Sequence, residues 1–373
     1  MAEQQQQERQ KPRVPITLTV NGKTFTGWLQ SNVRRSIEAL AGTFNVPVAL
    51  VPGTVPEIKR QDAISVRIGE TVLITGYVLS ADPFYSKDDC GLRIVGRDRS
   101  GDLAVCAAIH KGGQWRNATL ERIVKDIVQP YGIAVRNDAT GDANEPIRDY
   151  KLEHGERCAD AIARAARLRG VLVVPDARGN LRITRAGAQR FEAAIVRGKN
   201  VISAEGVGTD EERHSEYLVY GQNNTSTDFE RARCQKARAV DSEIKRHMPM
   251  VINAEGNLTQ KELQDLANHT MRVRRGHAYG IKYVVEGWEA DGQPWPINQR
   301  VAIYDDIFGL DGAEWLICEA NATCDLKEGD VTELLVRPVD AYDTIRRGDK
   351  PKPQKAKGKR GQNDKARLEN KTQ

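Results

Sequence analysis

The sequence predicts a mainly β protein of the α+β class, in which two similar β-barrel domains flank a small α/β domain. Strand-like alternation of apolar and polar residues fills the first hundred residues and returns after about residue 200, whereas the middle has apolar residues at helical spacing. Both ends of the chain are polar and rich in Gln or Lys. The expected parts are a disordered arm (1–13), a first β-barrel domain (14–112), an α/β domain (113–198), a second β-barrel domain with a helical insertion at about 257–275 (199–345), and a basic disordered tail (346–373).

The first domain begins with an expected β-hairpin. Residues 16–20 alternate apolar and polar side chains, and the Asn21-Gly22 pair that follows favours a type I′ turn. The return strand is expected at 23–29. Residues 31–41 resemble a short helix or turn. Further strands are expected at 63–68, 71–80 and 91–97.

The α/β domain is expected to contain two helices. Apolar residues recur with a period of three to four at 120–128, and the Gln-Pro-Tyr-Gly sequence after them ends that helix. An Ala-rich helix at 158–169 ends at Gly170, which suits the left-handed position after a helix. A strand start at 133–135 and a hairpin of 171–174 with 181–184 complete this part.

The second β-rich part contains one long expected helix. Strands return from Val201 onward, most clearly at 217–220. Residues 257–275 have a helical pattern, with Thr259 as an N-cap and Glu262 three residues later as its capping-box partner. Strands are expected again up to Val339.

Three strands of the first domain resemble three strands of the last. The apolar runs at 63–68, 72–77 and 92–95 are repeated as runs at 300–304, 315–319 and 334–336. Steps of ten and twenty residues, counted from Val72 and from Trp315, match between the two sets. The alternative is that any three-stranded meander gives this pattern. If the repeat is real, each chain carries two copies of one barrel, which is a route to a pseudo-symmetric ring.

The positive charge of the chain is concentrated in its tail. The 373 residues carry a formal net charge of +5, but residues 346–373 alone hold eleven Lys/Arg against three Asp/Glu. The rest of the chain has 45 basic and 48 acidic residues, so it lacks the basic footprint of a nucleic-acid-binding domain. The tail is expected to touch nucleic acid or an acidic partner, or only to keep the protein soluble.

The lack of a targeting signal and the spacing of the cysteines indicate a protein made in a reducing compartment. No apolar run is long enough to span a bilayer, and the polar N-terminus has no signal-peptide core, so we expect synthesis in a cytoplasm. The cysteines are widely spaced with no CxxC pair, which is typical of free thiols. They are Cys90, Cys106, Cys158, Cys234, Cys318 and Cys324.

Catalytic signatures are absent from the sequence. It contains no GxSxG, no HExxH, no phosphate loop and no His pair at ligand spacing. We therefore predict no catalytic, cofactor-binding or metal-ligating residues. Four weaker patterns have structural interpretations that we favour over functional ones.

Cys318 and Cys324 are expected to share one strand face, where two small core residues are favoured over a metal site. His269 and His277 flank basic residues and indicate a solvated helix end. The pairs Asp88-Asp89 and Asp305-Asp306 are ordinary turn chemistry rather than hydrolytic acids. Trp28, Trp115, Trp288, Trp295 and Trp315 are scattered and suit core packing, although a ligand site at the hairpin between Trp288 and Trp295 stays open.

The chain resembles the baseplate hub proteins of Mu-like contractile-tailed phages, also called tail protein P. The resemblance covers about residues 15–345, and it rests on the order and spacing of its motifs rather than on any single one. They are Val20-Asn21-Gly22-Lys23 with Phe25, Gly27 and Trp28; Val33 to Glu38; Gly76-Tyr77-Val78; Gly91 to Asp98; the 153–170 helix with the 171–185 hairpin; Glu286-Gly287-Trp288 with Trp295, Ile297 and Asn298; and Glu314 to Ile317.

This resemblance implies a structural protein of the virion, without cofactors and without enzymatic activity. It implies a homotrimer, a pseudo-hexameric ring of six barrels that adapts the six-fold tail tube to the three-fold central spike. Spike, tube and baseplate wedge proteins are the implied partners, and assembly in the bacterial host cytoplasm is implied. Late control D proteins and the N-terminal part of type VI secretion spike proteins are related. A cell-wall-degrading tail enzyme and a nucleic-acid-binding module acting through the tail are the alternatives.

Overall fold

The computed structural model describes residues 16–26, 31–49, 58–87, 90–222, 235–257, 260–325 and 329–342. Strands dominate this part of the chain, as the predicted mainly β class requires. The expected arm and basic tail lie outside the described residues, and so do Trp28, Asp88, Asp89, Cys234 and Thr259. No helix within the described ranges is long and apolar enough to cross a membrane.

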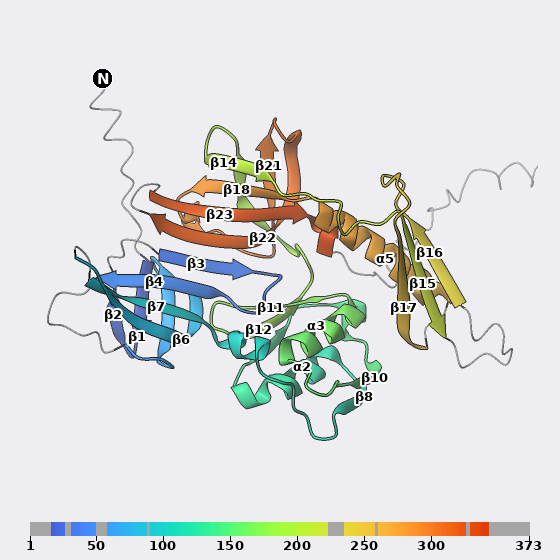
Figure 1. Ribbon diagram of the computed structural model, residues 1–373. Coiled ribbons are helices and arrows are strands. Elements are labelled where there is room, and N and C mark those ends of the chain that lie inside the picture. Colours follow the sequence, from blue (N-terminus) through green and yellow to red (C-terminus); the bar gives the residue numbers. More distant parts are fainter. Residues whose placement is uncertain are drawn as a thin grey trace, which may run out of the picture.

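One sheet of thirteen strands runs through the molecule (Figure 1). Its main path has the order β14-β18-β23-β22-β3-β4-β7-β6-β5-β1-β2, and β21 pairs with both β13 and β22. The strands expected in two separate domains therefore belong to a single sheet, and β3 lies against β22 at their junction.

The first module comprises the strands of residues 16–98, and its expected hairpin is confirmed. Asn21 and Gly22 have φ angles of 50° and 80°, as a type I′ turn needs, and they place Val20 opposite Lys23. The apolar face of the sheet buries Leu18, Val46 and other aliphatic side chains. The strands are β1 (Ile16–Val20), β2 (Lys23–Phe25), β3 (Ser31–Ser36), β4 (Thr43–Ala49), β5 (Ala63–Ile68), β6 (Thr71–Tyr85) and β7 (Cys90–Asp98).

The expected helix or turn at 31–41 is wrong, because residues 31–36 form strand β3. Its sequence, Ser-Asn-Val-Arg-Arg-Ser, has one apolar residue, and the buried positions are Ser31, Val33 and Ser36, which do not alternate regularly. Such a polar strand is stabilised by its neighbours: it pairs with β4 on one side and with β22 on the other. Only residues 37–40 form the bend.

The α/β part, residues 99–184, has its own apolar core, and both expected helices are confirmed. Thr119 caps the first helix by accepting from the Arg122 amide (3.3 Å), and Gly170 ends the second in the left-handed conformation (φ 61°). The elements are η1 (Arg99–Ala104), β8 (Gln114–Ala118), α2 (Leu120–Val128), η2 (Gln129–Tyr131), β9 (Val135–Asn137), η3 (Gly141–Asn144), β10 (Ile147–Lys151), α3 (Cys158–Arg169), β11 (Leu172–Pro175) and β12 (Leu181–Thr184).

The second module surrounds a core of Ile195, Tyr283, Trp295 and further apolar residues. Its β18–β23–β22–β21 strands are antiparallel neighbours, whereas β13 pairs with β21 in parallel. The elements are β13 (Gln189–Val196), β14 (Val201–Gly206), β18 (Ile281–Glu286), β19 (Glu289–Ala290), β20 (Gln293–Pro294), β21 (Gln299–Asp305), β22 (Leu310–Asp325), β23 (Gly329–Pro338) and η4 (Val339–Tyr342).

A helix-backed sheet is inserted between β14 and β18 and projects to one side of the molecule (Figure 1). It comprises β15 (Glu216–Gln222), β16 (Gln235–Val240), β17 (Pro249–Asn257) and α5 (Gln260–Ala278). The expected helix is confirmed, but it begins at Gln260 rather than at 257, because residue 257 still belongs to β17. Leu263 and Ala267 of α5 are fully buried against the sheet.

Candidate assembly interface

The expected three-stranded repeat has a structural counterpart, since β5–β6–β7 and β21–β22–β23 have similar pairing. Both are antiparallel meanders, and each has two breaks in register. In β6 the pairing skips Leu73 and Leu79, and in β22 it skips Gly312 and Cys318. The skipped residues are six apart in both strands, so the two meanders have one plan.

The residue-by-residue alignment expected from the sequence is wrong, however. With the bulges superposed, Val72 corresponds to Asp311 rather than to Trp315, and Asp82 corresponds to Asn321. The apolar spacing of a meander recurs every few residues, so it fixes the strand order but not the register. The bulges supply the register, and the sequence shows no signal for them.

Strand β22 connects the two modules through its second half, residues 319–324. Residues 310–316 pair with β21, and residues 319–324 pair on the same side with β3. Ala322 and Cys324 thereby enter the core of the first module, and Trp288 joins them there while its Nε1 donates to the Thr323 carbonyl (2.8 Å). The first module's core is therefore completed by residues of the second.

Two arginines of β3 fasten this junction. Arg34 donates to both carboxylate oxygens of Glu319, at 2.7 and 2.8 Å. Arg35 points to the other face and donates to the Trp295 carbonyl (2.6 Å), and burial lowers its pKa to about 10.

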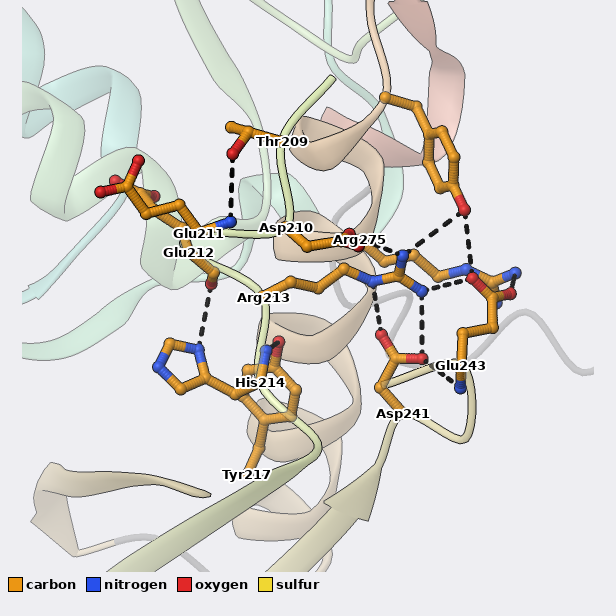
Figure 2. Close-up of polar contacts among 11 residues, drawn as sticks. Thr209, Asp210, Glu211, Glu212, Arg213, His214, Tyr217, Asp241, Glu243 and Arg275 are labelled. Carbon is orange, nitrogen blue, oxygen red and sulfur yellow. Dashed lines mark hydrogen bonds and ion pairs between the residues drawn. The ribbon is translucent and has the colours of Figure 1, made fainter. Parts of the chain in front are cut away.

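A buried arginine in the segment that leads into the helix-backed sheet binds the loop after β16 (Figure 2). Arg213 has only 3% of its side chain exposed, and it donates to both oxygens of Asp241 (2.8 and 3.1 Å). Asp210 and Glu243 also accept from it. Burial alone would lower the pKa of Arg213, but these carboxylates raise it above its usual value.

The basic run near His277 forms ion pairs in the same cluster while staying partly exposed, so the expected solvated helix end is only partly correct. Arg275 pairs with Glu243, and Arg274 donates to the backbone oxygen of Glu212 (2.9 Å). His277 packs edge-on against Tyr342 of η4 (4.8 Å between ring centroids). His269 lies eight residues earlier, about 12 Å along the helix axis, so the two histidines do not form one site.

The remaining weak patterns do not converge on a chemical site. Cys318 lies at the β22 bulge and packs beside Tyr342, whereas Cys324 enters the first module's core, so the expected shared face is wrong. Asp305 is buried and accepts from the Tyr283 hydroxyl (3.1 Å), while Asp306 is exposed and pairs with Arg197 (2.7 Å). Within the ranges that the structure describes, no three His, Cys, Asp or Glu side chains could hold a metal ion.

The tryptophans of the described chain pack into cores, as expected, or are half-buried. Trp288 and Trp295 flank the β19–β20 hairpin, but their rings enter different cores. Trp295 is 1% exposed and stacks at a tilt on Phe191 (5.4 Å). Trp115 lies against His110 (4.2 Å) in the α/β part, and Trp315 is half-buried in the second module. No pair of them forms an open aromatic clamp.

Two family models match consecutive parts of the chain. The model described as Mu phage baseplate assembly protein GpP-like, N-terminal, matches residues 15–98. The model described as baseplate hub protein gp44-like, second domain, matches residues 100–185.

Full-length relatives extend this likeness. The baseplate hub protein gp44 of Escherichia phage Mu is 31% identical over 336 residues, which is 88% of each chain. The crystal structure of the prophage MuSo2 43 kDa tail protein from Shewanella oneidensis is also 31% identical, with a TM-score of 0.78 over 88% of this chain and 99% of the other. The E. coli c3393 protein, a type VI secretion component, shares the fold at 10% identity, with a TM-score of 0.54 over 88% of this chain and 79% of its own.

Proposed function

The chain belongs to the gp44-like family of phage baseplate hub proteins, and from this premise we propose that three copies close a ring at the base of a contractile tail. Its close relatives are structural hub proteins and not enzymes, so the chain has a structural baseplate role. The ring would match six similar modules to a six-fold tail tube above and to a three-fold spike below.

The observation that carries the ring is the repeated, doubly bulged meander within one sheet. Each chain presents the same strand plan twice, so three chains present it six times. The modules differ in their flanking strands, because β1 meets β5 antiparallel whereas β13 meets β21 in parallel. In such a ring the six meanders would follow approximate six-fold symmetry, whereas the flanking strands would repeat only three times. An adaptor between a six-fold tube and a three-fold spike needs both symmetries.

The partners proposed for this hub are a central spike protein, the tail tube and baseplate wedge proteins. Support comes from the relatives: the E. coli c3393 protein is described as structurally similar to the T4 tail proteins gp27 and gp5. The proposed location is the virion tail, after assembly in the host cytoplasm. The cell-wall-degrading alternative is dropped, because the close relatives are not enzymes.

We propose three parts as in the expected division into 14–112, 113–198 and 199–345, but with boundaries near residues 99 and 185, because the apolar cores cross the expected boundaries. One core gathers residues of the first module, one lies within 103–183, and one gathers residues 191–336. The proposed role of the 346–373 tail, in binding nucleic acid or an acidic partner, is tested by deleting it: salt-dependent DNA binding should disappear while the fold stays intact.

Mass measurement in solution tests the ring. Light scattering of the purified chain, alone and with the spike protein of the same particle, should give three hub chains per complex. Electron microscopy of that complex should show six meander lobes around a channel. A hub that stays monomeric in both samples, or a complex with a different number of hub chains, would contradict the proposed ring.

A further inference from the structure

Strand β14 presents an unpaired edge. Among the described strands it pairs only with β18, and the same extended path continues as Val207 and Thr209 donate to the carbonyls of Gly280 (2.9 Å) and Ala278 (3.1 Å). Residues 202–206 are exposed on both faces. Free backbone groups along such an edge are a template for another strand, so a native protein usually covers them.

The outer half of β6, residues 80–85, presents a second unpaired edge. It pairs with β7 on one side, and its other side has no neighbour among the described strands. Its counterpart in β22 is covered by β3, and the difference in burial is large. Cys324 is 6% exposed, whereas Tyr85 at the corresponding position is 85% exposed.

The internal repeat identifies these two edges as partners. In the first module, β3 pairs with β4, and β4 pairs with β7, the third strand of the meander. In the second module, β14 pairs with β18, and β18 pairs with β23, the third strand of the other meander. Thus β14 corresponds to β3, and β6 corresponds to β22. The β3–β22 pair is formed within one chain, but β14 lies at one end of the sheet path, β6 is its eighth strand, and the two do not pair within one copy.

We infer that β14 of one copy adds antiparallel to the outer half of β6 of a second copy, as β3 adds to β22 within the chain. Superposing the repeats fixes the register: Thr209 faces Ser80, Val207 faces Asp82, and Glu205 faces Phe84. This inference rests on the proposed ring and specifies its contact. Each copy has one edge of each kind, so a head-to-tail contact uses both and closes after three copies.

The side chains fit this register. Tyr85 would lie opposite Ala204, over a groove that is lined by Val201, Ala204, Ile307 and Phe308. Ile307 is 69% exposed, and burying it together with Tyr85 would favour the contact through the hydrophobic effect. Pro83 faces Gly206 and lacks an amide hydrogen, so one bond of the ladder is missing at that position.

Disulfide trapping tests the register. Ile37 donates to the Cys318 carbonyl (2.9 Å), so Arg34 and Asn321 form a non-hydrogen-bonded pair three positions away. Asp82 and Val207 occupy the corresponding positions, where Cβ atoms lie about 4.5–5.5 Å apart. The full chain carrying Asp82→Cys and Val207→Cys, with Cys90→Ser and Cys106→Ser, should form covalent trimers on oxidation, and peptide mapping should find the 82–207 bond between copies.

The matched control moves one cysteine along the edge. Ser203→Cys in place of Val207→Cys displaces the thiol by four residues, about 13 Å, and should leave the chain unlinked. Failure of the 82–207 bond to form overturns the edge pairing. If the mass in solution still corresponds to three chains, the proposed ring is retained and its subunits must meet through another contact. If no trimer forms even with the spike protein, the proposed ring is contradicted as well.

Tyr85→Lys gives a second, non-covalent test. The side chain is almost fully exposed in one copy, so the variant should fold normally, with an unchanged unfolding midpoint. Trimer assembly should need roughly tenfold more protein or worse. Thr71→Lys, at the exposed start of the same strand, should assemble like the parent. Equal assembly of the Tyr85 and Thr71 variants would contradict the proposed groove.

Discussion

Arg34 and Glu319 are 285 residues apart in the chain, yet they form a two-bond ion pair across the junction of β3 and β22. The pair joins strands of different modules, and it lies on the polar face of the sheet, opposite the shared core. More than half of the Arg34 side chain is exposed, so water screens the pair.

Glu319→Gln is therefore expected to lower the free energy of unfolding by no more than about 1 kcal/mol. The measurement is the urea midpoint at low and high salt, and the difference between variant and parent should shrink as salt rises. Asp306→Asn, which removes a more exposed pair with Arg197, is the control and should change less. A loss of several kcal/mol would mean that the ion pair, and not the shared core, holds the modules together.

Asp98 is expected to make stability fall as pH rises. Burial raises the pKa of this carboxyl to about 6, although Ser100 and the Gly42 amide donate to it at 2.7 and 2.6 Å. Its folded pKa is above the unfolded value of 3.8, so its contribution is present below pH 4 and is lost as pH rises through 6. Asp98→Asn should remove a pH-dependent part on the order of 3 kcal/mol from unfolding curves between pH 4 and 7. An unchanged pH dependence would contradict this assignment.

Arg213→Met is expected to loosen the helix-backed sheet. It leaves the buried Asp241 without its partner, which typically destabilises a protein by about 3–5 kcal/mol. Hydrogen exchange should quicken in β15–β17 and in α5 while the α/β part keeps its protection. Arg246→Met, at an exposed position beyond Asp241, should leave exchange unchanged. Faster exchange throughout the chain would show that Arg213 supports the whole fold instead.

Gly276→Ala is expected to push α5 away from η4. A Cβ at this position would lie 2.2 Å from the Ala341 Cα, and backbone on the facing element cannot move aside as a flexible side chain can. The variant should unfold at a lower temperature, by several degrees, as overpacked sites do. Gly206→Ala is the control, since its nearest atom would be 3.5 Å away. Equal melting temperatures would show that α5 can shift without loss.

Sequence reasoning predicted those elements whose signals are local. The Asn21-Gly22 turn, the apolar stripe of α2 and the glycine after α3 each depend on a few neighbouring residues. β3 escaped prediction because its strand character comes from β22, far along the chain. The Arg213 cluster escaped for the same reason: Asp241 is 28 residues away and Tyr279 is 66, and no spacing rule connects such partners.

The pairing of β3 with β22 also constrains how the protein is made. A ribosome adds about 5–20 residues per second, so β3 waits on the order of 15–60 seconds for a partner that is synthesised 285 residues later. During this interval the nascent chain exposes the edge of β3 that later pairs with β22. It also exposes the part of the first module's core that Ala322, Cys324 and Trp288 later cover. The amino-terminal third therefore reaches its native state only after translation is nearly finished, and chaperone binding to that exposed strand would protect newly made chains from aggregation.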